Sequence, residues 1–179
     1  MRVIVGFTEL HPYADAALTR WAPQAERFQL GPQFDAYHTL LAGIWQEGQG
    51  FLNIEHDVEI HADVVHRMRY CPHSWCLYPY RGDHPNRAGD GTIVGGLGCT
   101  RFHTSLVRRE ADLMATLPVK GYKQLDCHIK PALLDRGYAM HIHSPPVTHH
   151  HVYYPGSLCA CGQEAGHDLP EGSIHREKR

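Results

Sequence analysis

The stretch Phe51-Leu-Asn-Ile-Glu-His-Asp57 decides the fold of this chain. Its first half contains the apolar residues Phe51, Leu52 and Ile54, as in a strand buried inside a sheet, and its second half carries the carboxylates of Glu55 and Asp57. In open α/β sheets, ligands bind outside the carboxyl ends of the strands. We therefore predict that this strand delivers Glu55 and Asp57 to a ligand-binding edge.

The spacing of the two carboxylates indicates a metal site. Residues two positions apart project from the same side of an extended chain. A pair of carboxylates there forms a hard, oxygen-rich site that suits Mg²⁺ or Mn²⁺. Such an ion bridges diphosphate oxygens and neutralises charge on a leaving group. The alternative is that Glu55 and Asp57 are solvated residues at a strand end, because an acidic pair of this kind is common.

Strand-like and helix-like segments alternate on both sides of this stretch. The predicted strands are Arg2–Thr8, Glu26–Leu30, the first half of Phe51–Ile60, Ser74–Tyr80 and Tyr138–His143, and Thr92–Gly98 is expected to return to the core. The predicted helices are Ala14–Trp21, Phe34–Gly48, Ala62–Tyr70, Thr104–Leu117 and Lys123–Arg136. This order predicts an α/β fold, with a mainly parallel, Rossmann-like sheet covered by helices on both faces.

The bulk properties narrow the class of protein. A chain of 179 residues with 42% hydrophobic residues can form one core, and we expect one domain over residues 1–155. A net charge of −2 argues against a strongly cationic, nucleic-acid-binding surface. The apolar runs are too short to span a membrane, and the N-terminus does not have the pattern of a signal peptide. We therefore expect a cytoplasmic protein whose six cysteines are reduced thiols or metal ligands.

In its order of motifs, the chain resembles the GT-A glycosyltransferases, in a small, family-2-like and abbreviated form. The shared order is an N-terminal strand, an amphipathic helix and a strand ending in an Asp-x-Asp-type motif, here with Glu at the first position. The resemblance covers roughly Arg2 to Tyr154. It implies a GT-A-like sheet, a nucleotide-sugar donor and a Mn²⁺ or Mg²⁺ ion.

The resemblance also implies roles on the donor side. Asp57 coordinates the metal on the donor diphosphate, and Glu55 approaches the ribose or the metal. Phe7, Thr8 and Glu9, at the end of the first strand, lie near the nucleotide base and ribose.

Further roles follow for the second half of the chain. Gly96 and Arg101 belong to a small-residue segment beside the donor sugar and the acceptor. Asp126 matches the acidic residue that serves as general base in inverting members. From the residues alone, the glycines can mark only a bulge, Arg101 can be a surface charge, and Asp126 can cap a helix.

A late histidine often supplies a third metal ligand in that family. The segment His141-Ile-His-Ser-Pro-Pro-Val-Thr-His-His-His151 offers five candidates. We favour His149, with His151 as the second choice, because both follow the Pro-Pro break. Strand geometry would place His141 and His143 on one face, and likewise His149 and His151.

The last residues, 156–179, form a polar tail by composition. Cys159 and Cys161, with His167 and His175 beyond them, are candidates for a small structural Zn²⁺ site. Otherwise the tail is flexible. Cys71 and Cys76 fit a turn with two buried thiols.

The predicted function is transfer of a hexose from a nucleotide-sugar donor to an acceptor hydroxyl, with inversion. The acceptor can be a glycan, a lipid, a protein or a modified nucleic acid, and a second subunit of a homo-oligomer can complete its site. One alternative is a metal-dependent hydrolase or phosphoesterase that uses the same histidines and acids. Another is a non-enzymatic zinc-binding interaction module.

Overall fold

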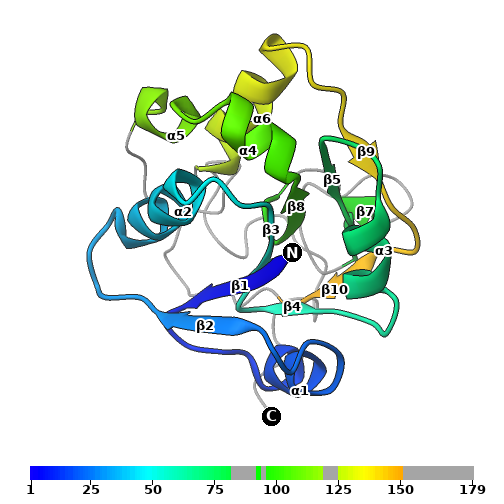
Figure 1. Ribbon diagram of the computed structural model, residues 1–179. Helices are drawn as coiled ribbons and strands as arrows, with labels where there is room; N and C mark the ends of the chain where they lie inside the picture. Colours follow the sequence, from blue (N-terminus) through cyan, green and yellow to red (C-terminus); the bar gives the residue numbers. More distant parts are fainter. Residues whose placement is uncertain (82–91, 94–95, 119–124, 151–179) are drawn as a thin grey trace, which may run out of the picture.

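The computed structural model describes residues 1–81, 92–93, 96–118 and 125–150 (Figure 1). The predicted polar tail at 156–179, the candidate zinc ligands Cys159 and Cys161, and His151 lie outside the described residues.

Six strands form the central sheet, in the order β2-β1-β3-β8-β5-β9. Their bounds are β1 Arg2–Phe7, β2 Glu26–Gln29, β3 Phe51–Glu55, β5 Trp75–Leu77, β8 Cys99–Phe102 and β9 His141–Ile142. Strand β8 runs antiparallel to both of its neighbours, β3 and β5, and all other pairs are parallel. The predicted α/β class with a mainly parallel sheet is therefore confirmed.

Helices cover both faces of this sheet, as predicted (Figure 1). Their bounds are α1 Pro12–Trp21, α2 Ala36–Gln46, α3 Val64–Tyr70, α4 Thr104–Arg109, α5 Leu113–Thr116 and α6 Asp126–Asp135. Side chains alternate along a strand, so Val5 of β1 packs with Leu18 of α1 and Met68 of α3. Its neighbour Ile4 faces the other way and packs with Leu41 of α2. Helices α4, α5 and α6 lie on that second face, because their buried residues join the same cluster.

A second, smaller sheet lies beside the end of β3. It has the order β4-β10-β6-β7, with β4 Val58–Glu59, β6 Tyr80–Arg81, β7 Thr92–Ile93 and β10 Val147–His149. Strand β10 pairs antiparallel with β4 and parallel with β6, so that His149 lies opposite Val58 and Val147 opposite Tyr80. The late histidines thus come to the acidic segment through backbone pairing.

Several elements differ from the prediction. The predicted strand Ser74–Tyr80 is divided between the two sheets, as β5 and β6, and the small sheet itself was not predicted. The strand β8 was not expected, because Thr100 and Arg101 make it look polar, yet all four of its residues are buried. The predicted helix Thr104–Leu117 is divided into α4 and α5. The carbonyl of Glu110 accepts hydrogen bonds from the indole of Trp45 at 2.8 Å and from the N–H of Leu113 at 3.0 Å.

None of the helices in the described ranges has both the length and the hydropathy of a membrane-spanning segment.

Candidate metal centre

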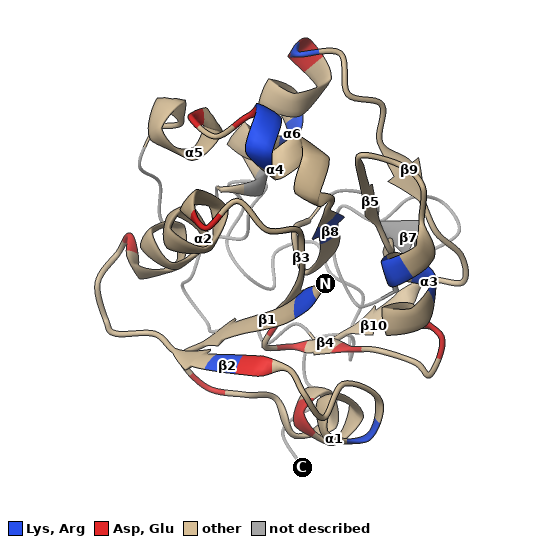
Figure 2. Ribbon diagram, in the orientation of Figure 1, with Lys and Arg blue, Asp and Glu red and all other residues tan. Residues whose placement is uncertain are grey.

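Three potential metal ligands meet where β3 ends. The carboxylates of Glu55 and Asp57 and the imidazole of His149 each offer one ligand atom, and these atoms all lie within 4.8 Å of one another. All three residues are half-buried. Figure 2 shows that acidic residues mark β4 and the turn leading into it.

The backbone around the two carboxylates is held on both sides. Glu55 is the last residue of β3 and lies opposite Gly6 of β1. Its N–H donates to the carbonyl of Gly98 at 2.9 Å. A two-residue turn then leads into β4, and the carbonyl of Asp57 accepts a hydrogen bond from the N–H of His150 at 2.8 Å. The backbone of both residues is therefore anchored by long-range pairing.

His149 is oriented toward Asp57. Its Nε2 lies 3.4 Å from Oδ1 of Asp57, and their side chains are only 10% and 14% exposed. The ring of His149 stacks on Tyr80, with ring centroids 4.9 Å apart and an interplanar angle of 18°. The stacking limits rotation of the imidazole and keeps Nε2 directed at the carboxylate.

Tyr80 occupies a space that two glycines leave open. A Cβ at Gly98 would lie 2.5 Å from Tyr80 Oη and 2.6 Å from Glu55 Oε2, and a Cβ at Gly96 would lie 2.5 Å from Tyr80 Oη. The N–H of Gly98 donates to Tyr80 Oη. Burial, together with the nearby carboxylate of Glu55, raises the pKa of Tyr80 well above its usual value, so the phenol stays neutral.

Tyr80 was not predicted to belong to the site. Its sequence position, at the end of the predicted strand Ser74–Tyr80, indicates only a strand residue. The signal that could have found it is the pair Gly96 and Gly98, since glycines in a strand-like segment mark a close approach by another group.

A second layer of histidines surrounds the acidic turn. His150 Nε2 lies 2.8 Å from Glu59 Oε2, and the ring of His150 stacks on His11 with centroids 4.4 Å apart. The N–H of His11 donates to the carbonyl of His56 at 3.0 Å. These contacts join the loop after β1 to the acidic turn after β3.

The predicted nucleotide-binding residues lie at the same edge of the sheet. Phe7 ends β1 one position beyond Gly6, which is the register partner of Glu55. Thr8 and Glu9 follow in the loop to α1 and are exposed. Gly96 contributes through its approach to Tyr80.

Arg101 is not brought together with this group. Its side chain is 3% exposed, and it donates to the carbonyl of His73 at 2.9 Å on the side of β5. Asp126 is the first residue of α6, but its side chain lies outside the described part of the structure, as does His151.

The chemistry of the three ligands fits a divalent cation. Two ligands on one ion at about 2.1 Å lie no more than about 4.2 Å apart. The 3.4 Å between Asp57 Oδ1 and His149 Nε2 is within that limit. Two carboxylates and one imidazole suit Mg²⁺ or Mn²⁺, whose other positions can be filled by water or by phosphate oxygens.

Comparisons with known proteins give only distant similarities. No family model and no curated protein matches the chain. Among solved structures, a glycosyltransferase involved in the glycosylation of the major capsid of PBCV-1 is 10% identical, covers 83% of this chain and 92% of its own, and has a TM-score of 0.48.

Two further structures are similar to the same extent. A197 from STIV is 13% identical over 100% of this chain and 99% of its own, with a TM-score of 0.49. A putative glucose-1-phosphate thymidylyltransferase from Bacillus anthracis is 11% identical over 82% of this chain and 87% of its own, with a TM-score of 0.48. At these identities and TM-scores, the similarities do not bear on activity.

Proposed function

We propose that this chain is a metal-dependent glycosyltransferase that moves a sugar from a nucleotide-sugar donor to an acceptor hydroxyl. One observation carries the proposal: the carboxylates of Glu55 and Asp57 and the imidazole of His149 converge at the carboxyl end of β3. Open α/β sheets bind ligands at this edge.

Three residues of the site would bind the metal, and a fourth positions one of these ligands. Glu55, Asp57 and His149 would hold Mn²⁺ or Mg²⁺, which when bound neutralises the charge on a departing nucleoside diphosphate. Tyr80 keeps the imidazole of His149 in place by stacking.

The proposed binding site for the donor nucleotide is the end of β1 and the loop that follows it. Phe7, Thr8 and Glu9 would contact the nucleotide base and ribose, since they follow β1 at the edge where Glu55 lies. Gly96 would lie beside the donor sugar, where a side chain would collide with Tyr80.

The acceptor side of the reaction is assigned to Asp126. We propose that its carboxylate takes the proton from the acceptor hydroxyl, which attacks the anomeric carbon as the bond to the diphosphate breaks. Direct attack inverts the configuration at that carbon. Replacing Asp126 by Asn is expected to lower kcat with little change in donor affinity, because the base acts only as the acceptor reacts.

A thermal-shift screen of sugar nucleotides with and without Mn²⁺ tests the donor and the metal together. Stabilisation that requires both Mn²⁺ and one donor is the expected result. Asp57→Asn should abolish it. The matched control is Glu59→Gln. Glu59 lies two positions after Asp57, but its carboxylate contacts His150 and is not one of the three potential metal ligands.

Four outcomes would contradict the proposal. Donor stabilisation that needs no Mn²⁺ removes the metal from the mechanism, and Mn²⁺-dependent stabilisation that persists in Asp57→Asn removes Asp57 from the metal site. Release of the free sugar without an acceptor product identifies a hydrolase. Release of pyrophosphate from a nucleoside triphosphate identifies a nucleotidyltransferase that uses the same edge of the sheet.

A further inference from the structure

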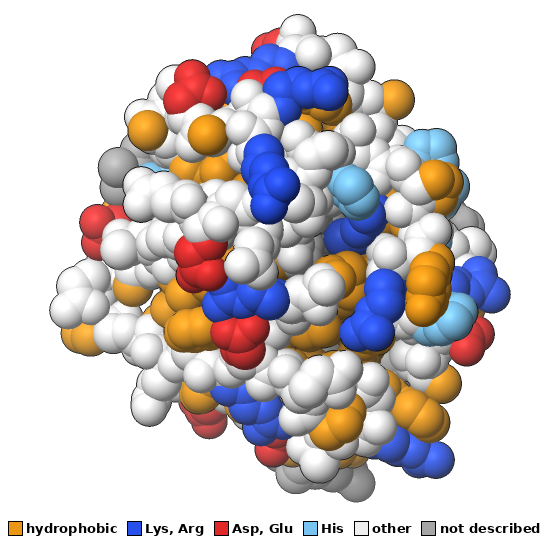
Figure 3. Space-filling model, viewed as in Figure 1, with side chains coloured by type: hydrophobic (Ala, Val, Ile, Leu, Met, Phe, Trp, Pro, Cys, Tyr) orange, Lys and Arg blue, Asp and Glu red, His pale blue; other side chains and the backbone are white. Residues whose placement is uncertain are grey.

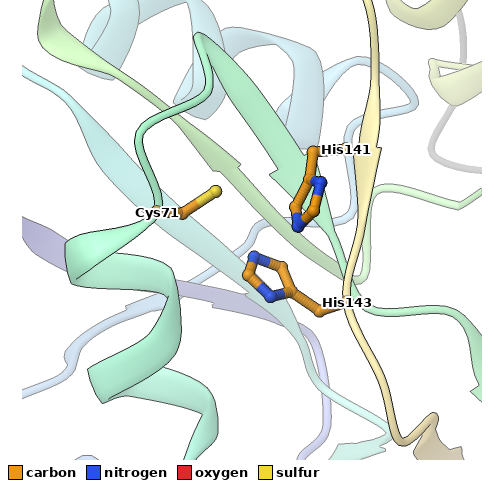
Figure 4. A group of neighbouring side chains, drawn as sticks. All are labelled: Cys71, His141 and His143. Carbon is orange, nitrogen blue, oxygen red and sulfur yellow. The ribbon is translucent and has the colours of Figure 1, made fainter.

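A second group of metal-ligating side chains lies apart from the residues of the proposed centre. Cys71, His141 and His143 each offer one ligand atom, and these atoms lie within 4.8 Å of one another. Figure 4 shows the thiol and both imidazoles directed into the same space, between the segment after α3 and the segment that contains β9. None of these three residues has a role in the proposed transfer.

The fold itself brings the three residues together. Cys71 directly follows α3 in an extended conformation and is buried. Strand β9 pairs in parallel with β5, with His141 opposite Cys76. His141 and His143 share one face, as their alternate positions predict, and the N–H of His143 donates to the carbonyl of Leu77 at 2.9 Å.

The imidazole of His143 has a buried nitrogen that needs a partner. Within the described part of the chain, its Nε2 has no hydrogen-bond partner. Buried polar atoms without partners are rare in proteins and often mark an ion or a water. The ring is held in place, stacked on Tyr78 at 4.9 Å between centroids and edge-on to His141 at 4.7 Å.

We propose that Cys71, His141 and His143 form a Zn²⁺ site with a fourth position open to water or another small ligand. One thiolate and two imidazoles are the ligand types that Zn²⁺ prefers, and they are poor ligands for Mg²⁺ or Mn²⁺. The ion ties the end of α3 to β9, the edge strand of the central sheet. The proposal is independent of the glycosyltransferase assignment, because the two groups share no residue.

Cobalt spectroscopy tests the site directly. All variants are made in a full-length protein that carries Cys159→Ser and Cys161→Ser, because these substitutions remove the competing thiols of the tail. Added Co²⁺ should give a thiolate-to-cobalt charge-transfer band and the d–d bands of a tetrahedral site. Cys71→Ser should abolish the charge-transfer band. Cys127→Ser, which changes an exposed thiol on α6, should retain it.

The histidines provide a second test that does not depend on the thiol. His141→Ala and His143→Ala should each weaken Zn²⁺ binding, measured by competition with a chelating dye. The loss should exceed the roughly 10–100-fold that follows removal of an outer-shell partner. His66→Ala, which changes an exposed histidine on α3, is the matched control and should leave the affinity unchanged.

The outcomes separate the two metal sites. A charge-transfer band that survives Cys71→Ser overturns the proposal, as does wild-type Zn²⁺ affinity in both histidine variants. If Cys71→Ser does not fold, as judged by circular dichroism, the histidine variants decide. Asp57→Asn should leave the Co²⁺ band intact, so failure of the glycosyltransferase proposal and failure of this one are distinguishable.

Discussion

Gly98 shows how one residue can set the geometry of the proposed centre. Its N–H donates to Tyr80 Oη, its carbonyl accepts from the N–H of Glu55, and the space above its Cα is filled by both side chains. Neither Tyr80, which is buried, nor Glu55, which ends a strand, can move away without losing those contacts.

Gly98→Ala is therefore expected to lower the free energy of unfolding by about 1–3 kcal/mol, the usual cost of overpacking. It should also weaken Mn²⁺ binding, because the new methyl group displaces the carboxylate of Glu55. Urea unfolding and Mn²⁺ titration measure the two effects.

Gly43→Ala is the control for this substitution. Gly43 lies inside α2, and a Cβ there meets nothing within 4 Å. Alanine should stabilise that helix by up to about 1 kcal/mol and leave Mn²⁺ affinity unchanged. Equal effects of the two substitutions would show that Gly98 has no special packing role.

The sequence predicted part of this centre at the level of residues. Asp57 and His149 were expected to share a site, and their side chains lie 3.4 Å apart. The role of each as a metal ligand stays a prediction. Tyr80 was missed because stacking on His149 depends on pairing between β6 and β10, and nothing in the local sequence encodes that pairing.

At the scale of elements, the junction between α4 and α5 is stabilised by one carboxylate. Glu110 accepts a hydrogen bond from Tyr138 Oη at 2.6 Å and pairs with Arg136. These contacts join the junction to the chain that follows α6. The bond from Tyr138, followed by the guanidinium of Arg136, lowers the pKa of Glu110 below its usual 4.5.

Because the folded state binds this proton less readily than the unfolded state, Glu110 stabilises the protein above pH 4.5 and loses that effect as the pH falls below it. Glu110→Gln is expected to reduce the free energy of unfolding by about 1–2 kcal/mol at neutral pH. The difference from the wild type should shrink in acid. Urea unfolding across this pH range measures it.

Asp112→Asn is the control for Glu110→Gln. The carboxylate of Asp112 also lies near Arg136, at 3.5 Å, but its side chain is 71% exposed. An exposed pair of this kind contributes less than about 1 kcal/mol. A difference between Glu110→Gln and the wild type that does not change with pH would rule out ionisation as the cause.

The elements differ in how well their sequences reveal them. Strand β3 and helix α2 were predicted because their apolar residues follow a clear strand run and a clear helical spacing. Strand β8 was not, since Arg101 reads as polar. The Arg101 side chain is buried, and the carbonyl of His73, distant in sequence, accepts a hydrogen bond from its guanidinium.

On the scale of the whole molecule, two groups of potential metal ligands with different chemistry border one core. Cys71, a member of one group, and Val58, which directly follows Asp57 of the other, belong to the same hydrophobic cluster. The surface elsewhere mixes basic, acidic and apolar side chains on the face shown in Figure 3, in keeping with a net charge of −2.

Since the two groups share no residue, Mn²⁺ and Zn²⁺ should stabilise the protein additively. At a concentration one hundred times its dissociation constant, each ion should add about 2.7 kcal/mol to the free energy of unfolding. Urea unfolding with each ion alone and with both ions together shows whether the two increases in the free energy of unfolding add. A combined effect no larger than that of Zn²⁺ alone would mean that both ions compete for one site.

The position of β10 between β4 and β6 has a consequence for biosynthesis. A ribosome releases Glu55 and Asp57 long before it releases His149, and domains tend to fold as units during translation. The nascent chain therefore carries its carboxylate pair without the imidazole until β10 emerges and inserts. Loading of the proposed cation would then be a late event in the maturation of the protein.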